Sequence, residues 1–202
     1  MIIIQIGIFI LCTSGFVYCG FNKCTDIQFE NSNFTLATTL NGKIQGQCET
    51  VDVIYSNLTK ISAHIFSWKK VPFAEPPIDE LRFLKPIPIK DWTDNKMCIE
   101  SPNVCSQLND EGILIGSEDC LYLNVYVRSD IYLNRNSSLN PVLVFIHGGD
   151  FTSGSSTGYD PSTIVALSGI IVITIQYRLN LFGFLRLEGT SATGNQGLFD
   201  QN

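Results

Sequence analysis

The segment Pro141–Phe151, PVLVFIHGGDF, decides the fold: an apolar run ends abruptly in His147, Gly148 and Gly149. Branched and aromatic residues favour a strand, and paired glycines let the backbone turn sharply where that strand ends. Such a turn delivers backbone N–H groups to an exposed point, as an oxyanion hole for acyl transfer requires. The segment therefore predicts a strand that leads directly into an anion-stabilising loop.

Two further apolar runs frame this segment, Leu121–Arg128 before it and Ile170–Tyr177 after it. Between the apolar run that ends at His147 and the run Ile170–Tyr177, residues Pro161–Ser168 can form a short helix. A strand, a helix and a near-continuous apolar strand in succession indicate a buried parallel sheet.

The upstream half has a different character. Leu40–Gln47 contains Asn-Gly and predicts a hairpin, and Lys60–Lys69 has the mixed pattern of a half-buried strand. Val71–Ile89 contains five prolines and predicts an extended surface loop outside the sheet. We therefore expect an α/β fold in which antiparallel strands lead into a mostly parallel sheet, with no linker dividing the chain.

The first residues indicate a secretory signal peptide. Ile2–Leu11 is apolar but too short to span a bilayer of about 30 Å, and small and polar residues follow it. Cleavage could fall after Gly15 or after Cys19, and we take residues 1–19 as the signal peptide and 20–202 as the mature chain; the alternative is a buried N-terminal strand. We expect a secreted, extracellular protein with no transmembrane segment beyond the signal peptide.

Secretion gives meaning to the sequons and the cysteines. Acceptor sequons for N-glycosylation occur at Asn33, Asn57 and Asn136. Five cysteines remain after removal of the signal peptide: Cys24, Cys48, Cys98, Cys105 and Cys120. Their odd number indicates a free thiol, an intermolecular bridge or a partner beyond the end of this chain.

Composition excludes one class of partner. A hydrophobic content of 45% suffices for a sizeable core, and the net charge is −6. The longest basic run is Lys69-Lys70, so no cluster exists to displace phosphate counterions. We expect no nucleic-acid partner.

Gly154–Gly158, GSSTG, matches the G-x-S-x-G pattern of a nucleophile elbow, but its context does not fit. An elbow needs a buried strand directly before it and a helix directly after it, whereas a polar loop precedes this segment. Both histidines, His64 and His147, also come before Ser156, which is the wrong order for that fold. We interpret Ser155 and Ser156 as loop residues over a pocket.

A series of motifs carries a family resemblance. In chain order they are Pro72–Pro77, Leu81–Phe83, Ser117–Val125, His147–Gly149, Tyr177–Leu179, Phe182–Leu185, Gly194–Leu198 and Asp200-Gln201. In this order and spacing they closely resemble the type-B carboxylesterase and cholinesterase family of α/β-hydrolases. The resemblance implies that residues 20–202 are the N-terminal part of such a domain, truncated before the nucleophile elbow, with the catalytic serine, acid and histidine beyond Asn202.

The resemblance assigns the oxyanion loop to this segment. The backbone N–H groups of Gly149 and Asp150 match two family donors, and a third would follow the missing serine. Most relatives have glycine or alanine where Asp150 stands. Its carboxylate would oppose a developing oxyanion unless it points away or is protonated; the alternative is a tolerated loop residue that faces solvent or a basic neighbour.

Other matches concern the scaffold and the substrate. The resemblance implies ion pairs between Arg82 and Glu118 and between Arg178 and Asp200, and a disulfide between Cys105 and Cys120. We expect His147 to orient the glycines, with a more direct involvement in the site as the alternative. The loop between the two cysteines lacks the tryptophan with which cholinesterases bind a quaternary ammonium, so a general carboxylesterase fits better than a choline-ester specialist.

Three functions remain in view. The first is a secreted carboxylic ester hydrolase that acts on small-molecule esters through a serine nucleophile and needs no cofactor. The second is a catalytically silent, neuroligin-like adhesion or binding protein on the same fold. The third is a non-functional truncated product. The residue at the missing elbow would separate the first two.

Overall fold

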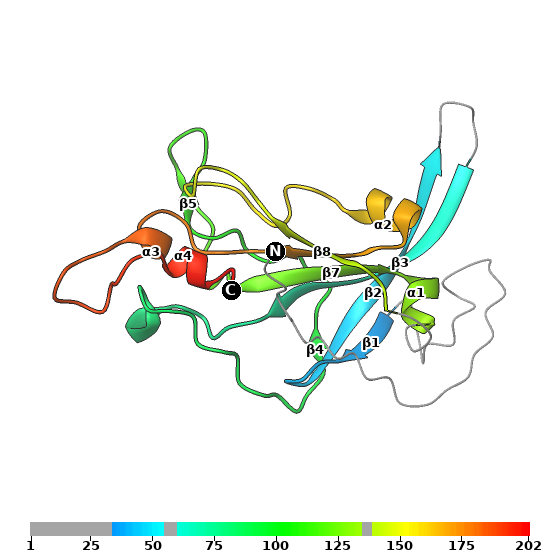
Figure 1. Cartoon of the computed structure of the whole chain (residues 1–202), viewed down its shortest axis with the longest axis horizontal. Coiled ribbons are helices and arrows are strands. Elements are labelled where there is room, and N and C mark those ends of the chain that lie inside the picture. The colour runs from blue at the N-terminus through cyan, green and yellow to red at the C-terminus, as the bar shows by residue number, and fades with distance from the viewer. Residues whose placement is uncertain (1–33, 55–59, 135–138) are drawn as a thin grey trace.

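The computed structural model describes residues 34–54, 60–134 and 139–202 (Figure 1). The predicted signal peptide, Cys24 and the sequons at Asn33, Asn57 and Asn136 lie outside the described residues. The main feature is a mixed sheet in the order β1-β2-β3-β7-β9-β8, with the short strand β4 paired to β2. Its strands are β1 (Phe34–Thr38), β2 (Lys43–Ile54), β3 (Lys60–Pro72), β4 (Lys96–Met97), β7 (Tyr122–Arg128), β8 (Val142–Ile146) and β9 (Ile171–Ile175).

The remaining elements are short. A separate hairpin consists of β5 (Gln107–Leu108) and β6 (Leu114–Ile115). The helices are the 3-10 turn η2 (Asp79–Leu81), α1 (Ser129–Leu133), α2 (Ser162–Ser168), α3 (Asn180–Phe184) and α4 (Gln196–Phe199).

The antiparallel half begins at the predicted hairpin. β1 and β2 pair with Thr38 opposite Lys43, and Asn41-Gly42 lies in the turn between them. The Gly42 carbonyl accepts hydrogen bonds from the backbone N–H and the hydroxyl of Thr39, at 2.8 and 2.9 Å. The prediction of a hairpin around Asn-Gly is confirmed, and β2 extends beyond the predicted segment.

β3 is longer than the predicted strand. After a register shift it continues to Pro72, which pairs with Tyr122 of β7. The expectation that Val71–Ile89 lies wholly outside the sheet is therefore wrong for its first two residues. The pairing of β2 with β3 reaches only as far as Ser67, so the missing N–H of Pro72 faces a side of β3 that has no partner strand there.

Side chains alternate between the two faces of the sheet, and a different helix covers each face (Figure 1). Phe66 and Trp68 of β3 pack with Tyr132 of α1 in one cluster. Ile65, which directly precedes Phe66 on the strand and so points to the opposite face, packs with Val165 of α2 in the other cluster. The two-residue period of a strand thus supplies both halves of the core from one short segment.

β8, α2 and β9 form the predicted strand–helix–strand unit. β8 and β9 pair in parallel, with Val142 opposite Ile171 and Ile146 opposite Ile175. α2 is followed by Gly169, whose left-handed φ of 70° and N–H bond to the Val165 carbonyl cap the helix. Because β9 also pairs antiparallel with β7, the α/β class and the change from antiparallel to parallel pairing are confirmed. The described sheet is nevertheless mostly antiparallel, because only β8 with β9 and β4 with β2 pair in parallel.

The parallel register of β8 and β9 positions the candidate site. The two strands end side by side, so the residues that follow Ile146 lie next to those that follow Ile175. This arrangement brings His147, which follows β8, into contact with Tyr177, which lies beyond the end of β9.

Candidate active site

The loop of residues 147–154, here called the glycine loop, follows β8 and turns back at Gly149. The φ of Gly149 is 120°, and a Cβ there would lie 2.1 Å from the Ser153 carbonyl oxygen, so glycine is required. The Gly149 carbonyl accepts hydrogen bonds from the N–H groups of Thr152 and Ser153, at 2.9 and 3.0 Å. Within the described residues, the N–H groups of Gly149 and Asp150 donate to no acceptor.

The glycine loop stores backbone strain that Asn180 of α3 holds in place. Asp150 and Phe151 have left-handed φ values of 54° and 60°, a conformation that costs residues other than glycine about 1–2 kcal/mol each. The Asn180 backbone N–H donates to the Phe151 carbonyl at 2.8 Å, and its Nδ2 donates to the Thr152 carbonyl at 2.7 Å. Two hydrogen bonds from one residue therefore fix the strained part of the loop.

His147 supports the glycine loop from beneath. It is 3% exposed, and its ring stacks on Tyr177 with the centroids 4.4 Å apart. The Tyr177 hydroxyl donates to the His147 carbonyl at 2.9 Å, and His147 Nδ1 lies 3.0 Å from the Gly148 carbonyl oxygen. Burial lowers the pKa of His147 below its ordinary value of 6.5, which favours a neutral ring whose Nδ1–H donates to that carbonyl.

The Asp150 side chain is exposed, and in the described part of the chain it forms no ion pair. No basic residue within those ranges neutralises it. The exposed side chain of Asp150 therefore fits the expectation of a loop residue that faces solvent, and not that of a loop residue beside a basic neighbour.

Ser156 is a buried loop residue. It is 1% exposed, its hydroxyl accepts a hydrogen bond from Asn124 Nδ2 at 3.2 Å, and its N–H donates to Gln176 Oε1 at 3.1 Å. No strand precedes it directly, and α2 starts only at Ser162. The other histidine, His64, contacts Thr50 of β2 rather than this serine. Nothing here forms a nucleophile elbow.

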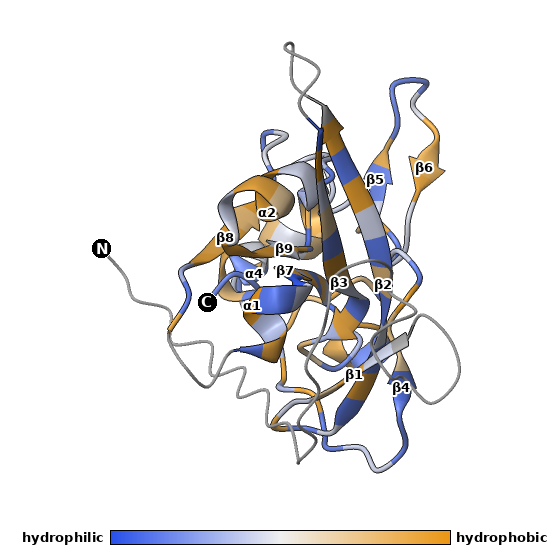
Figure 2. Ribbon diagram, turned by 90° about the vertical axis from the view of Figure 1, so that its right-hand side faces the viewer, coloured by the Kyte–Doolittle hydropathy of each residue, from blue (hydrophilic) through white to orange (hydrophobic). Residues whose placement is uncertain are grey.

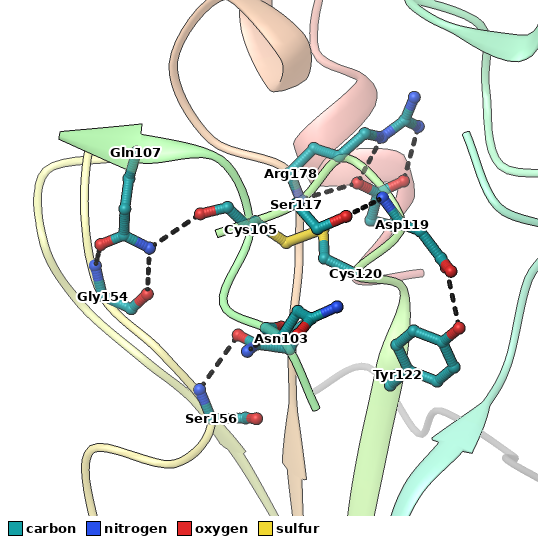
Figure 3. Close-up of a disulfide and its surroundings, with 12 residues drawn as sticks. Asn103, Cys105, Gln107, Ser117, Asp119, Cys120, Tyr122, Gly154, Ser156 and Arg178 are labelled. Carbon is teal, nitrogen blue, oxygen red and sulfur yellow. Dashed lines mark hydrogen bonds and ion pairs between the residues drawn. A yellow bond between two sulfur atoms is a disulfide. The ribbon is translucent and has the colours of Figure 1, made fainter. Parts of the chain in front are cut away.

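A disulfide closes a loop beside the glycine loop (Figure 3). It joins Cys105 and Cys120, the pair that the family resemblance implies, and both sulfurs are buried. Inside this disulfide loop, the β5–β6 hairpin projects from the body of the molecule with a hydrophobic β6 (Figure 2). Cys98 is a buried free thiol, and burial raises its pKa to about 11.

The two implied ion pairs are present and differ in burial. Arg178 Nη2 lies 2.7 Å from Asp200 Oδ1, with side chains 3% and 0% exposed. The Arg178 backbone N–H also donates to the Asp200 carboxylate at 2.9 Å. In the other pair, Arg82 Nη2 donates to Glu118 Oε1 at 2.9 Å, with side chains 37% and 24% exposed. Since Arg178 follows Tyr177 directly, the buried pair fixes the chain beneath His147.

Sequence reasoning missed the residues that hold the glycine loop in place. Tyr177 belongs to a recognised motif, but its hydroxyl contact to His147 depends on the parallel register of two strands. Asn180 and Gln107, which bonds to Gly154 (Figure 3), carry no motif of their own. Their partners are 28 and 47 residues away in sequence, and no periodicity links such positions.

Among the described residues, no group of three or more His, Cys, Asp or Glu side chains gathers to hold a metal ion. None of the helices in those residues combines the length and the apolar character needed to cross a membrane.

Comparison with known proteins places the chain in a family. The model of the carboxylesterase family matches residues 33–202. Carboxylesterase 1D of Rattus norvegicus is 36% identical over 82% of this chain and 30% of its own length. Cocaine esterase of Oryctolagus cuniculus is 35% identical over 85% of this chain and 33% of its own length, and a carboxylic ester hydrolase of Bombus ignitus is 38% identical over 71% and 27%. The chain belongs to the carboxylesterase family.

The chain spans about a third of the length of the relatives that it matches, with 30% of the rat and 33% of the rabbit protein covered. The activity of the whole protein is therefore a matter for proposal.

Proposed function

We propose that the complete protein is a secreted, serine-dependent carboxylic ester hydrolase, in which the N–H groups of Gly149 and Asp150 are two donors of the oxyanion hole. One observation carries the proposal: both N–H groups find no acceptor among the described residues, and they lie on a strained loop that neighbouring residues hold at several points. Membership of the carboxylesterase family and the names of the relatives support the reaction class.

In this reaction a serine hydroxyl attacks the ester carbonyl, and the carbonyl oxygen gains a negative charge as its π bond breaks. The alcohol then leaves with a proton, and water hydrolyses the acyl-enzyme. By family resemblance the serine, the acid and the histidine belong to sequence beyond Asn202. The glycine loop would bind the oxyanion, and because its donors are already fixed, little reorganisation is needed as the charge develops.

Gly149→Ala in the complete gene product tests this role. The added Cβ would clash with the Ser153 carbonyl, so the two donors move, and kcat for p-nitrophenyl acetate should fall by about 100-fold or more. The matched control is Gly189→Ala, because Gly189 also has a positive φ of 77° but nothing lies near its Cβ position. Equal loss in both folded variants would contradict the proposal.

Secretion rests on the predicted signal peptide and the sequons. Expression in a secreting eukaryotic cell should release protein that begins after Gly15 or Cys19 and that loses mass on treatment with an N-glycosidase. Asn→Gln variants at Asn33, Asn57 and Asn136 should each lose one glycan. Retention of residues 1–19 in the folded product would refute the signal peptide.

The second candidate is a catalytically silent, neuroligin-like binding protein, favoured by the carboxylate of Asp150 beside the proposed donors. If this candidate is right, the complete gene product hydrolyses no ester, and Asp150→Gly does not restore turnover. If the protein is an esterase, Asp150→Gly removes an opposing charge and should raise kcat.

A further inference from the structure

The side-chain amide of Gln107 in the disulfide loop grips one residue of the glycine loop. Gln107 Oε1 accepts a hydrogen bond from the Gly154 N–H at 2.9 Å, and Gln107 Nε2 donates to the Gly154 carbonyl at 2.9 Å. The same Nε2 also donates to the Cys105 carbonyl at 2.9 Å. Gln107 is 7% exposed, so these bonds form away from bulk water (Figure 3).

This pairing fixes both position and orientation. The amide engages the donor and the acceptor of one backbone residue, as a neighbouring strand would, while the bond to Cys105 holds the amide itself. An apolar side chain would leave both backbone groups of Gly154 unpaired in a partly buried place.

Gly154 is in direct contact with the base of the proposed oxyanion hole. Its φ is 116°, and a Cβ there would lie 2.3 Å from both His147 Nδ1 and the Gly148 carbonyl oxygen. The Gly154 backbone therefore packs against His147 and Gly148 without space for a side chain. A shift of Gly154 would be felt by the residue directly before the Gly149 N–H.

We propose that Gln107 is a positioning residue that couples the disulfide loop to the oxyanion donors. Tyr177 and Asn180 hold the glycine loop from the side of β9 and α3, and Gln107 holds its far end from the disulfide loop. The Cys105–Cys120 bridge then acts on catalysis through Gln107, although neither cysteine contacts the donors. The claim that Gln107 affects catalysis rests on the proposed ester hydrolysis. The claim that Gln107 holds the glycine loop in place, here called the mechanical part, does not.

The test compares Gln107→Leu, Gln107→Glu and Asn109→Ala in the complete gene product. Glutamate keeps an acceptor for the Gly154 N–H but loses both donations. Asn109 is the matched control because its Oδ1 accepts hydrogen bonds from Glu111 and Ile113 within the same disulfide loop, away from Gly154.

Amide hydrogen exchange, measured by mass spectrometry, tests the mechanical part, that Gln107 holds the glycine loop in place. Peptides covering 148–156 should exchange about tenfold faster in Gln107→Leu, less so in Gln107→Glu, and at the wild-type rate in Asn109→Ala. If Gln107→Leu yields little folded protein, the near-isosteric Gln107→Glu decides the result. Wild-type exchange in a folded Gln107 variant would overturn the proposal.

Steady-state kinetics with p-nitrophenyl acetate test whether Gln107 affects catalysis. Gln107→Leu should lower kcat about tenfold or more while KM stays nearly constant, and Asn109→Ala should leave both unchanged. Faster exchange with an unchanged kcat would overturn the positioning role. A wild-type protein that hydrolyses no ester would refute the proposed function, while the exchange data would still decide whether Gln107 holds the loop.

Discussion

The core of the sheet and the glycine loop are stabilised in opposite ways. The core consists of apolar side chains such as Phe66 of β3 and Val165 of α2, both 0% exposed, on regular strands and helices. The glycine loop has consecutive left-handed residues and is held by hydrogen bonds from Tyr177, Asn180 and Gln107. Packing tolerates many apolar sequences, whereas the hydrogen bonds that Tyr177, Asn180 and Gln107 side chains make to the loop each depend on one particular residue. Damage to the core should lower global stability, and damage to the loop should change local geometry.

The largest effect should come from Phe66→Ala. The ring packs edge-to-face against Tyr132, with centroids 5.4 Å apart, and is fully buried, so its removal should lower the free energy of unfolding by about 3–5 kcal/mol. Urea denaturation measures this. Ile61→Ala, at a 40% exposed position of the same strand, should cost far less; equal costs would show that packing does not dominate β3.

Asp200→Asn should have the next largest effect, about 3 kcal/mol, because it leaves the charge of Arg178 buried and unpaired. The matched control is Asp52→Asn, which breaks an ion pair with Lys60 whose side chains are 54% and 46% exposed, and which should change stability little. Urea denaturation again gives the result, and similar losses from both pairs would contradict the role of burial.

Tyr177→Phe tests whether the glycine loop can be perturbed without a large loss of core stability. It keeps the ring stacked on His147 but removes the hydroxyl that bonds to the His147 carbonyl, which should cost about 1 kcal/mol and speed amide exchange in the glycine loop. Tyr122→Phe removes a comparable bond, to Asp119, and should leave exchange in the loop unchanged. An effect of both variants on the loop would show that the loop responds to general destabilisation.

The smallest effect concerns pH. The pKa of His147 is lowered by burial in the folded protein, so the unfolded chain binds this proton more readily. The stabilising effect of the neutral ring is complete above the ordinary pKa of 6.5 and should be lost as the pH falls below it. Thermal unfolding from pH 7.5 to 5 should show this loss, and His147→Phe should reduce it. Tyr177→Phe, which keeps the histidine, should retain the pH dependence.

Sequence patterns predicted the strands because each one carries its own apolar run, but they did not predict burial everywhere: β8 lies at the edge of the described sheet, with Val142, Leu143 and Ile146 exposed. The apolar runs that became β7, β8 and β9, and the helix that became α2, were recognisable from local periodicity. The prediction failed at Pro72, where an N–H is dispensable because β2 has already ended its pairing with β3. That circumstance depends on the lengths of neighbouring strands.

The candidate site was predictable only in part. Paired glycines after an apolar strand indicate a turn with accessible N–H groups, and the family resemblance supplied the cysteine pair and the ion pairs. The contacts that hold the turn could not be found in this way: Gln107 meets Gly154 because a disulfide loop folds against the glycine loop. Such a contact is a property of tertiary packing, and a single sequence contains no local signal for it.

The left-handed backbone at Asp150 has an evolutionary consequence. Glycine accepts a φ of 54° without the clash that a Cβ causes, and one nucleotide change converts an aspartate codon to a glycine codon. That single mutation would relieve strain and remove a negative charge beside the proposed donors at once. Branched residues such as valine, also one nucleotide away, are sterically disfavoured there. A single substitution at this position would therefore change two properties together, the backbone strain and the charge beside the proposed donors.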